Sequence, residues 1–87
     1  MKKIRTITLR GVKYKVLWFK DPDKLIDFDG RCNKQDKIIE IRCGLSARDT
    51  NVVLIHEIFH AFFWDLDESV VVDTAIDLER VLNQLNK

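Results

Sequence analysis

The most reactive side chains of this sequence gather in one apolar segment. Residues 52–64 contain ten apolar residues and three ionisable ones, namely His56, Glu57 and His60. Positions i and i+4 are neighbours on one face of a helix, so a helix here would hold the two imidazoles side by side. Two imidazoles in that arrangement can occupy two corners of a tetrahedral zinc site, and the adjacent carboxylate can accept a proton from water. The H-E-x-x-H spacing therefore predicts zinc-dependent hydrolytic chemistry.

The apolar surroundings of the motif strengthen this interpretation. A helix that is apolar nearly all round should be buried on most sides, and burying a carboxylate and two imidazoles is costly unless a partner compensates. The chain has only two histidines, and both fall in the motif. The simpler alternative is a pair of core histidines with Glu57 exposed. The combined spacing and context favour one bound Zn²⁺ per chain.

A catalytic zinc ion needs a third protein ligand and one position left open for water. Glu68 precedes Val71, Val72 and Ala75 at helical spacings, so it extends the apolar stripe that should pack on the first helix. Its carboxylate would then face the two histidines. We predict Glu68 as the third ligand, with Asp67, the expected N-cap of the second helix, as the alternative.

Other acidic residues near the motif fit less well. Asp65 lies nine residues beyond His56, which is about half a turn round a helix, and Asp73 lies about 140° from the line of Glu68. Phe63 and Leu66 stand where a metzincin would need a glycine and a third ligand. The metzincin class is therefore excluded.

The two cysteines offer a different metal site. Cys32 and Cys43 could complete a Cys₂His₂ structural site, but their spacing suits no compact zinc finger. Such a closed site would also leave Glu57 without a role. We expect two half-buried strand thiols that stay reduced, as is usual inside cells.

Strands are predicted for the first half of the chain. A period of two over residues 3–19, with turn residues at Arg10 and Gly11, predicts a hairpin. Two further strands are expected over residues 28–33 and 37–42. The strand at 37–42 leads into the motif, and as a sheet edge it could pair with an extended substrate.

Helices are predicted for the second half. Ser46, followed three residues later by an acid, indicates the start of a helix over 47–64, and a second helix should span 68–84. The prediction is one α+β domain over residues 1–87, with a small antiparallel sheet followed by two packed helices. We expect the aromatic residues to pack mainly in the core: Tyr14, Trp18, Phe59, Phe62, Phe63 and Trp64.

Composition excludes several other classes of protein. The chain is 46% hydrophobic and 33% charged, unlike disordered or collagen-like sequences. The apolar run at 52–64 is shorter than the roughly 20 residues of a membrane-spanning helix, and the first residues lack the apolar stretch of a signal peptide. We therefore expect a cytoplasmic protein with no membrane partner.

The charge distribution suggests a second function. Residues 1–20 hold seven Lys and Arg, although the net charge is only +1. The alternative hypothesis is a non-catalytic regulatory or interaction module with a structural zinc, which binds nucleic acid through the basic hairpin. The bases alternate with apolar residues, however, as on the solvated face of a strand. A nucleic-acid partner is therefore not expected.

Four segments of the chain resemble a known family. They are Gly30-Arg31-Cys32-Asn33, the strand at 37–42, His56-Glu57-Ile58-Phe59-His60-Ala61 and Glu68-Ser69-Val70-Val71. Over about residues 28–85 the chain is similar to the short zinc metallopeptidases of phages and prophages, the minigluzincin type. The gap between His60 and Glu68 is shorter than in larger gluzincins.

This resemblance implies a role for each residue of the motif. It implies that zinc is bound by His56, His60 and Glu68, and that Glu57 is the general base. It also implies a peptide or protein substrate and a phage or prophage gene in a bacterial host.

Overall fold

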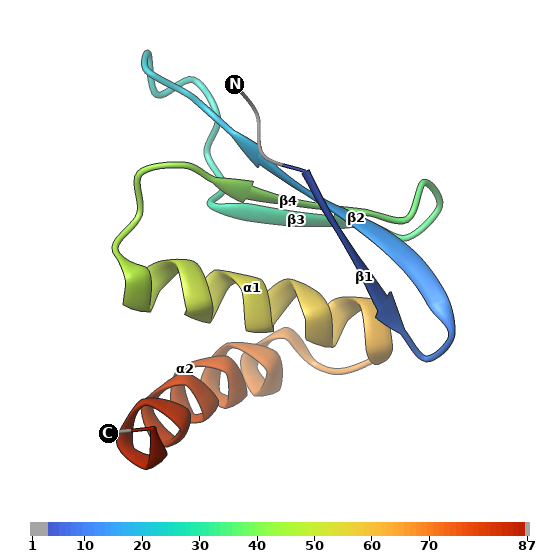
Figure 1. Ribbon diagram of the computed structural model, residues 1–87, viewed down its shortest axis with the longest axis vertical. Helices are drawn as coiled ribbons and strands as arrows, with labels where there is room; N and C mark the ends of the chain where they lie inside the picture. Colours follow the sequence, from blue (N-terminus) through green and yellow to red (C-terminus); the bar gives the residue numbers. More distant parts are fainter. Residues whose placement is uncertain (1–3, 87) are drawn as a thin grey trace.

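The computed structural model describes residues 4–86, so the predicted start of the hairpin at residue 3 lies outside the described residues. Four strands precede two helices along the chain, and the predicted α+β fold is confirmed (Figure 1). The elements are β1 (Ile4–Leu9), β2 (Val12–Phe19), β3 (Gly30–Asn33), β4 (Ile38–Arg42), α1 (Ala47–Phe62) and α2 (Glu68–Leu85).

The sheet is mixed rather than antiparallel. Its strand order is β1-β2-β4-β3, in which the β1–β2 and β3–β4 pairs are antiparallel and the β2–β4 pair is parallel. The expectation of a wholly antiparallel sheet was therefore wrong. In the β3–β4 hairpin it is β4, not β3, that lies beside β2. The two central strands, β2 and β4, therefore run in the same direction.

Composition explains why β4 takes the central place. Ile39 and Ile41 of β4 are fully buried, whereas β3 is shorter and consists of Gly30, Arg31, Cys32 and Asn33. An apolar strand gains most from burial between two neighbours, and a short polar strand is tolerated at an edge. The expectation that residues 37–42 form a sheet edge was accordingly wrong, because β3 is the edge strand on that side.

The first hairpin turns on the two predicted residues. Arg10 and Gly11 both have positive φ, at 52° and 80°. Two central residues with positive φ are typical of a type I′ turn, whose twist matches that of the flanking strands. The hairpin pairs Leu9 with Val12 directly across this turn.

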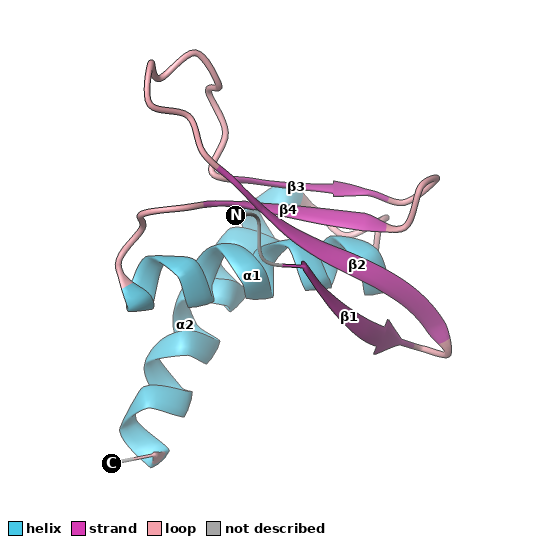
Figure 2. Cartoon of the chain, turned by 45° about the horizontal axis from the view of Figure 1, so that its top comes forward, coloured by secondary structure: helices cyan, strands magenta, loops and turns pink. Residues whose placement is uncertain are grey.

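The helices form two further layers on one face of the sheet. Helix α1 lies against the sheet, and α2 lies on the far side of α1 (Figures 1 and 2). Within residues 4–86, α2 packs on α1 and on no strand. Neither helix of this part of the chain is long and apolar enough to span a membrane.

The main core lies between the sheet and α1. Tyr14 and Val16 of β2 and Ile39 and Ile41 of β4 are buried there, with α1 side chains packed against them, namely Val53, Leu54, Ile58 and Ala61. The alternation predicted for β2 is seen over residues 13–16, where Lys13 and Lys15 are exposed and Tyr14 and Val16 are buried. It does not extend to the ends of the strand, because Val12 is exposed and Phe19 is buried. This core fixes the orientation of α1 and thereby of the side chains on its remaining faces.

Arg42, at the end of β4, holds together the long loop that connects β2 to β3. Its guanidinium donates to the carboxylates of Asp21 (3.0 Å) and Asp29 (2.9 Å) and to the carbonyl oxygens of Ile26 (2.7 Å) and Phe28 (2.8 Å). The loop leads directly into β3 (Figure 2), whose first residue is Gly30. Arg42 therefore sets the position at which the edge strand begins.

Candidate metal centre

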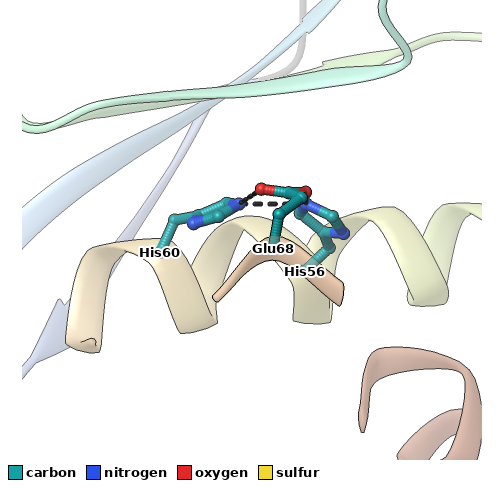
Figure 3. Close-up of side chains that lie close together, drawn as sticks. All are labelled: His56, His60 and Glu68. Carbon is teal, nitrogen blue, oxygen red and sulfur yellow. Dashed lines mark hydrogen bonds and ion pairs between the residues drawn. The ribbon is translucent and has the colours of Figure 1, made fainter. Parts of the chain in front are cut away.

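Three side chains from two helices converge on one point. The Nε2 atoms of His56 and His60 lie 3.0 Å apart, and the Glu68 carboxylate approaches them at 2.7 Å and 3.1 Å respectively (Figure 3). Within residues 4–86, this is the one place where at least three His, Cys, Asp or Glu side chains bring their ligand atoms close enough to share a metal ion. We call these three residues the His56–His60–Glu68 cluster. The predicted residues are thus brought together, and their role as metal ligands stays a prediction.

Helix α1 supplies the two histidines from its C-terminal half. It begins at the predicted N-cap, where the Ser46 side chain accepts a hydrogen bond from the Asp49 amide at 3.0 Å. The four-residue spacing then places His56 and His60 on the same face, with ring centroids 4.7 Å apart. Both imidazoles are half-buried.

Helix α2 supplies the carboxylate from its first residue. Asp67 caps this helix, because its Oδ1 accepts a hydrogen bond from the Ser69 amide at 3.0 Å. One and two turns further on, Val71 and Ala75 are fully buried in the helical packing. The cap and this packing together aim Glu68 at the histidines, whereas Asp67, the alternative ligand, lies outside the cluster.

The donor set and its geometry fit zinc. Two ligand atoms about 2.0–2.1 Å from a tetrahedral ion lie about 3.3 Å apart. The observed separations of 2.7, 3.0 and 3.1 Å would therefore open by about 0.2–0.6 Å around such an ion. Two imidazoles and one carboxylate are also the protein ligands of one class of catalytic zinc site. The Glu68 side chain is 63% exposed, which leaves access for a fourth ligand from solvent.

Glu57 lies beside this cluster but faces the sheet. Glu57 is only 7% exposed. This burial, together with the negative charge of Glu68, raises the pKa of Glu57 to about 7. A group with this pKa can exchange a proton at neutral pH. The alternative expectation, in which Glu57 would be exposed, was wrong.

Gly30 makes close contact between β3 and α1 possible. A β-carbon placed at this position would lie 2.4 Å from Val53 Cγ1 and 3.1 Å from Glu57 Oε2. A side chain larger than that of glycine would therefore force the Val53 side chain, or the helix or strand itself, to shift. The edge strand therefore passes directly beside Glu57, a relationship that the sequence signalled only by an isolated glycine in a strand.

A small pocket opens where this strand begins. It has a volume of about 210 Å³ and is lined by residues of both elements, including Gly30, Val52, Val53, His56 and Glu57. The His56–His60–Glu68 cluster thus borders a cavity that is partly apolar, because His56 belongs to the cluster and lines the cavity. An extended chain running along β3 could place one side chain in it.

The turn after β3 and the loop between the helices are joined by a contact that the sequence did not suggest. Lys34 Nζ, in the turn after β3, lies 4.2 Å from the ring centroid of Trp64, in the loop between the helices. Trp64 is 69% exposed and Phe63 is 44% exposed. The expectation that these two aromatic residues belong to the core was therefore wrong.

Comparison of the sequence with models of known families and with curated proteins, and of the structure with solved structures, finds no match. The assignment of the site therefore depends on its own geometry and chemistry.

The remaining predicted candidates lie elsewhere. Cys32, on β3, and Cys43, just after β4, are free thiols outside the His56–His60–Glu68 cluster. Burial, and the nearby charge of Glu57, raise the pKa of Cys32, so it is present as a neutral thiol. A Cys₂His₂ site has no support from this arrangement. Asp65 and Asp73 are also outside the cluster, as expected from their positions on the predicted helices, which point them away from the histidines.

Proposed function

We propose that this protein is a zinc-dependent metallopeptidase. His56, His60 and Glu68 hold one zinc ion per chain, and Glu57 is the general base. The observation that carries the proposal is the convergence of the two imidazole nitrogens and the Glu68 carboxylate within 2.7–3.1 Å, with a buried carboxylate on the adjacent residue.

Zinc bound there would lower the pKa of a water ligand and polarise the carbonyl of the scissile peptide bond. Glu57 accepts a proton from the attacking water and passes it to the nitrogen of the leaving amine. Burial keeps the proton affinity of Glu57 high. A zinc ion held by the neighbouring ligands would lower this pKa and favour the carboxylate form that a general base needs.

The edge strand suggests how a peptide is held. Among residues 4–86, no strand pairs with the outer side of β3, because β3 ends the sheet order next to β4. An extended peptide that pairs with this edge gains backbone hydrogen bonds. It also passes Gly30 and Glu57, and the pocket at Val52 and Val53 takes one small side chain.

The deciding experiment compares Glu57→Gln with the purified parent protein. We expect the variant to retain one zinc per chain and to lose peptidase activity on a mixed peptide library by about 10²–10⁴-fold. Asp65→Asn removes an exposed carboxylate outside the cluster and serves as the control, with activity unchanged. A variant that cleaves the library as fast as the parent, or a parent that binds no zinc, would contradict the proposal.

The alternative, a non-catalytic module with a structural zinc, depends on the basic hairpin. Lys13 and Lys15 are exposed on β2, as this hypothesis requires. Their alternation with buried Tyr14 and Val16 is explained equally well by a solvated sheet face. Binding of DNA that weakens steeply with salt, together with an inactive zinc-loaded protein, would favour this alternative.

A further inference from the structure

Glu79 is a buried carboxylate in the middle of α2. Its side chain is only 9% exposed, and its ion-pair partner is Arg48, whose Nε lies 3.7 Å away. That distance is too long for a hydrogen bond. The Arg48 side chain is 62% exposed, so most of it already lies in solvent. This loose contact leaves the Glu79 carboxylate oxygens with the capacity to accept hydrogen bonds from a second cationic group.

The carboxylate lies at the wall of a pocket between the two helices. The pocket has a volume of about 330 Å³ and has aliphatic walls formed by Leu54, Ile55, Ile58 and Leu82. Side-chain amides of Asn51 and Asn83 add polar groups to its lining. An apolar cavity of this size, with a few polar groups, has the character of a small-molecule site.

This pocket is separate from the His56–His60–Glu68 cluster. Asn51 and Ile58 lie about 200° round α1 from His56, so the two sites use opposite faces of the helix. Neither histidine nor Glu68 lines the pocket. The inference therefore does not depend on the proposed peptidase function.

We propose that the pocket binds a small organic cation, with an ammonium or guanidinium group carried on an apolar body. Glu79 is the one charged residue in the lining, and it is negative. The charged group of the ligand would pair with the Glu79 carboxylate, which Arg48 approaches only to 3.7 Å. The aliphatic walls would cover the apolar body, and the amide oxygens would accept hydrogen bonds from the N–H groups.

The test is a titration followed by NMR of the methyl groups in the full chain. The probes are hexylammonium, its neutral analogue hexan-1-ol and its anionic analogue hexanoate. We expect saturable shifts at Leu54, Ile55, Ile58 and Leu82 with hexylammonium, with a dissociation constant on the order of millimolar. Hexan-1-ol should bind at least tenfold more weakly, and hexanoate should not bind.

Two variants and a control test whether the charge in the pocket determines binding. Glu79→Gln keeps the shape and should weaken hexylammonium binding at least tenfold. Asn83→Lys, at an exposed helical position that tolerates lysine, places a cation in the lining and should abolish binding. Gln84→Lys adds the same charge one residue further on, outside the lining, and should bind like the parent.

The outcomes that overturn the proposal are equally specific. Absence of saturable shifts in the parent, equal binding of the three probes, or unchanged binding in a folded Glu79→Gln protein would each refute it. If Glu79→Gln fails to fold, Asn83→Lys decides the question, because hexylammonium binding that survives this substitution also refutes the proposal.

Discussion

His56 Nε2 and Glu68 Oε1 lie 2.7 Å apart although they belong to different helices. The geometry of the candidate metal centre therefore depends on how α2 packs against α1, not only on the spacing within one helix. Val71 and Ala75 fix that packing, since both are fully buried. A substitution that shifts the two helices should change metal affinity without touching a ligand.

The first prediction distinguishes two adjacent acidic residues. Glu68→Gln should lower zinc affinity by at least about 100-fold, because it replaces a charged ligand in a set of three. Asp67→Asn keeps a good N-cap and removes a carboxylate that lies outside the cluster, so zinc affinity should change little. Competition with a chromogenic chelator measures both. Loss of zinc by Asp67→Asn alone would show that the third ligand is misassigned.

Zinc should also stabilise the fold, because its ligands come from two different helices and a bound ion would link them. At a free zinc concentration 100 times its dissociation constant, binding adds about 2.7 kcal/mol to the free energy of unfolding. For a chain of this size that raises Tm by roughly 10–20 °C. Differential scanning calorimetry with and without chelator measures the shift. The His56→Ala protein should show no zinc-dependent shift, and a shift as large as that of the parent would contradict the site.

Local sequence patterns were sufficient to predict the elements and the three clustered side chains. The period of two in β2, the caps at Ser46 and Asp67, and the i, i+4 histidines all depend on near neighbours in the chain. The orientation of Glu68 followed from its phase relative to Val71. These features are local, so a single sequence contains them.

What could not be predicted depends on contacts between distant segments. Alternation assigns a face to each residue of β4 but does not say which strand lies beside it, and so the parallel pairing with β2 was missed. The contact of Lys34 with Trp64 joins residues thirty positions apart, and no local pattern marks it. The helix also ends at Phe62, two residues earlier than the apolar run suggested.

Gly30 provides a prediction for packing between the edge strand and α1. Gly30→Ala should lower the free energy of unfolding by about 1–3 kcal/mol, because the new methyl group would lie 2.4 Å from Val53 Cγ1. Val53→Ala removes the methyl groups that it meets. The double variant should therefore be more stable than the sum of the two single losses predicts, by at least about 0.5 kcal/mol. Urea unfolding of the four proteins measures the coupling, and strictly additive losses would exclude the contact.

The loop that leads into Gly30 gives a prediction for acid stability. Burial alone would raise the pKa of Asp21, but hydrogen bonds from the Ile26 and Leu25 amides, together with the Arg42 guanidinium, outweigh burial and hold it below its usual value. A carboxyl group with a lowered folded-state pKa stabilises the fold above its unfolded-state pKa, and that stability disappears as the pH falls through the folded-state value.

Asp21→Asn should therefore lower Tm at pH 7, and its difference from the parent should shrink as the pH falls below about 4. Asp23→Asn, at an exposed position of the same loop, serves as the control and should follow the parent at every pH. Thermal unfolding of the three proteins between pH 2 and pH 7 measures the effect. A constant gap between Asp21→Asn and the parent over that range would mean that the Asp21 charge does not hold the loop, and that Arg42 positions it through Asp29 and the backbone carbonyl groups.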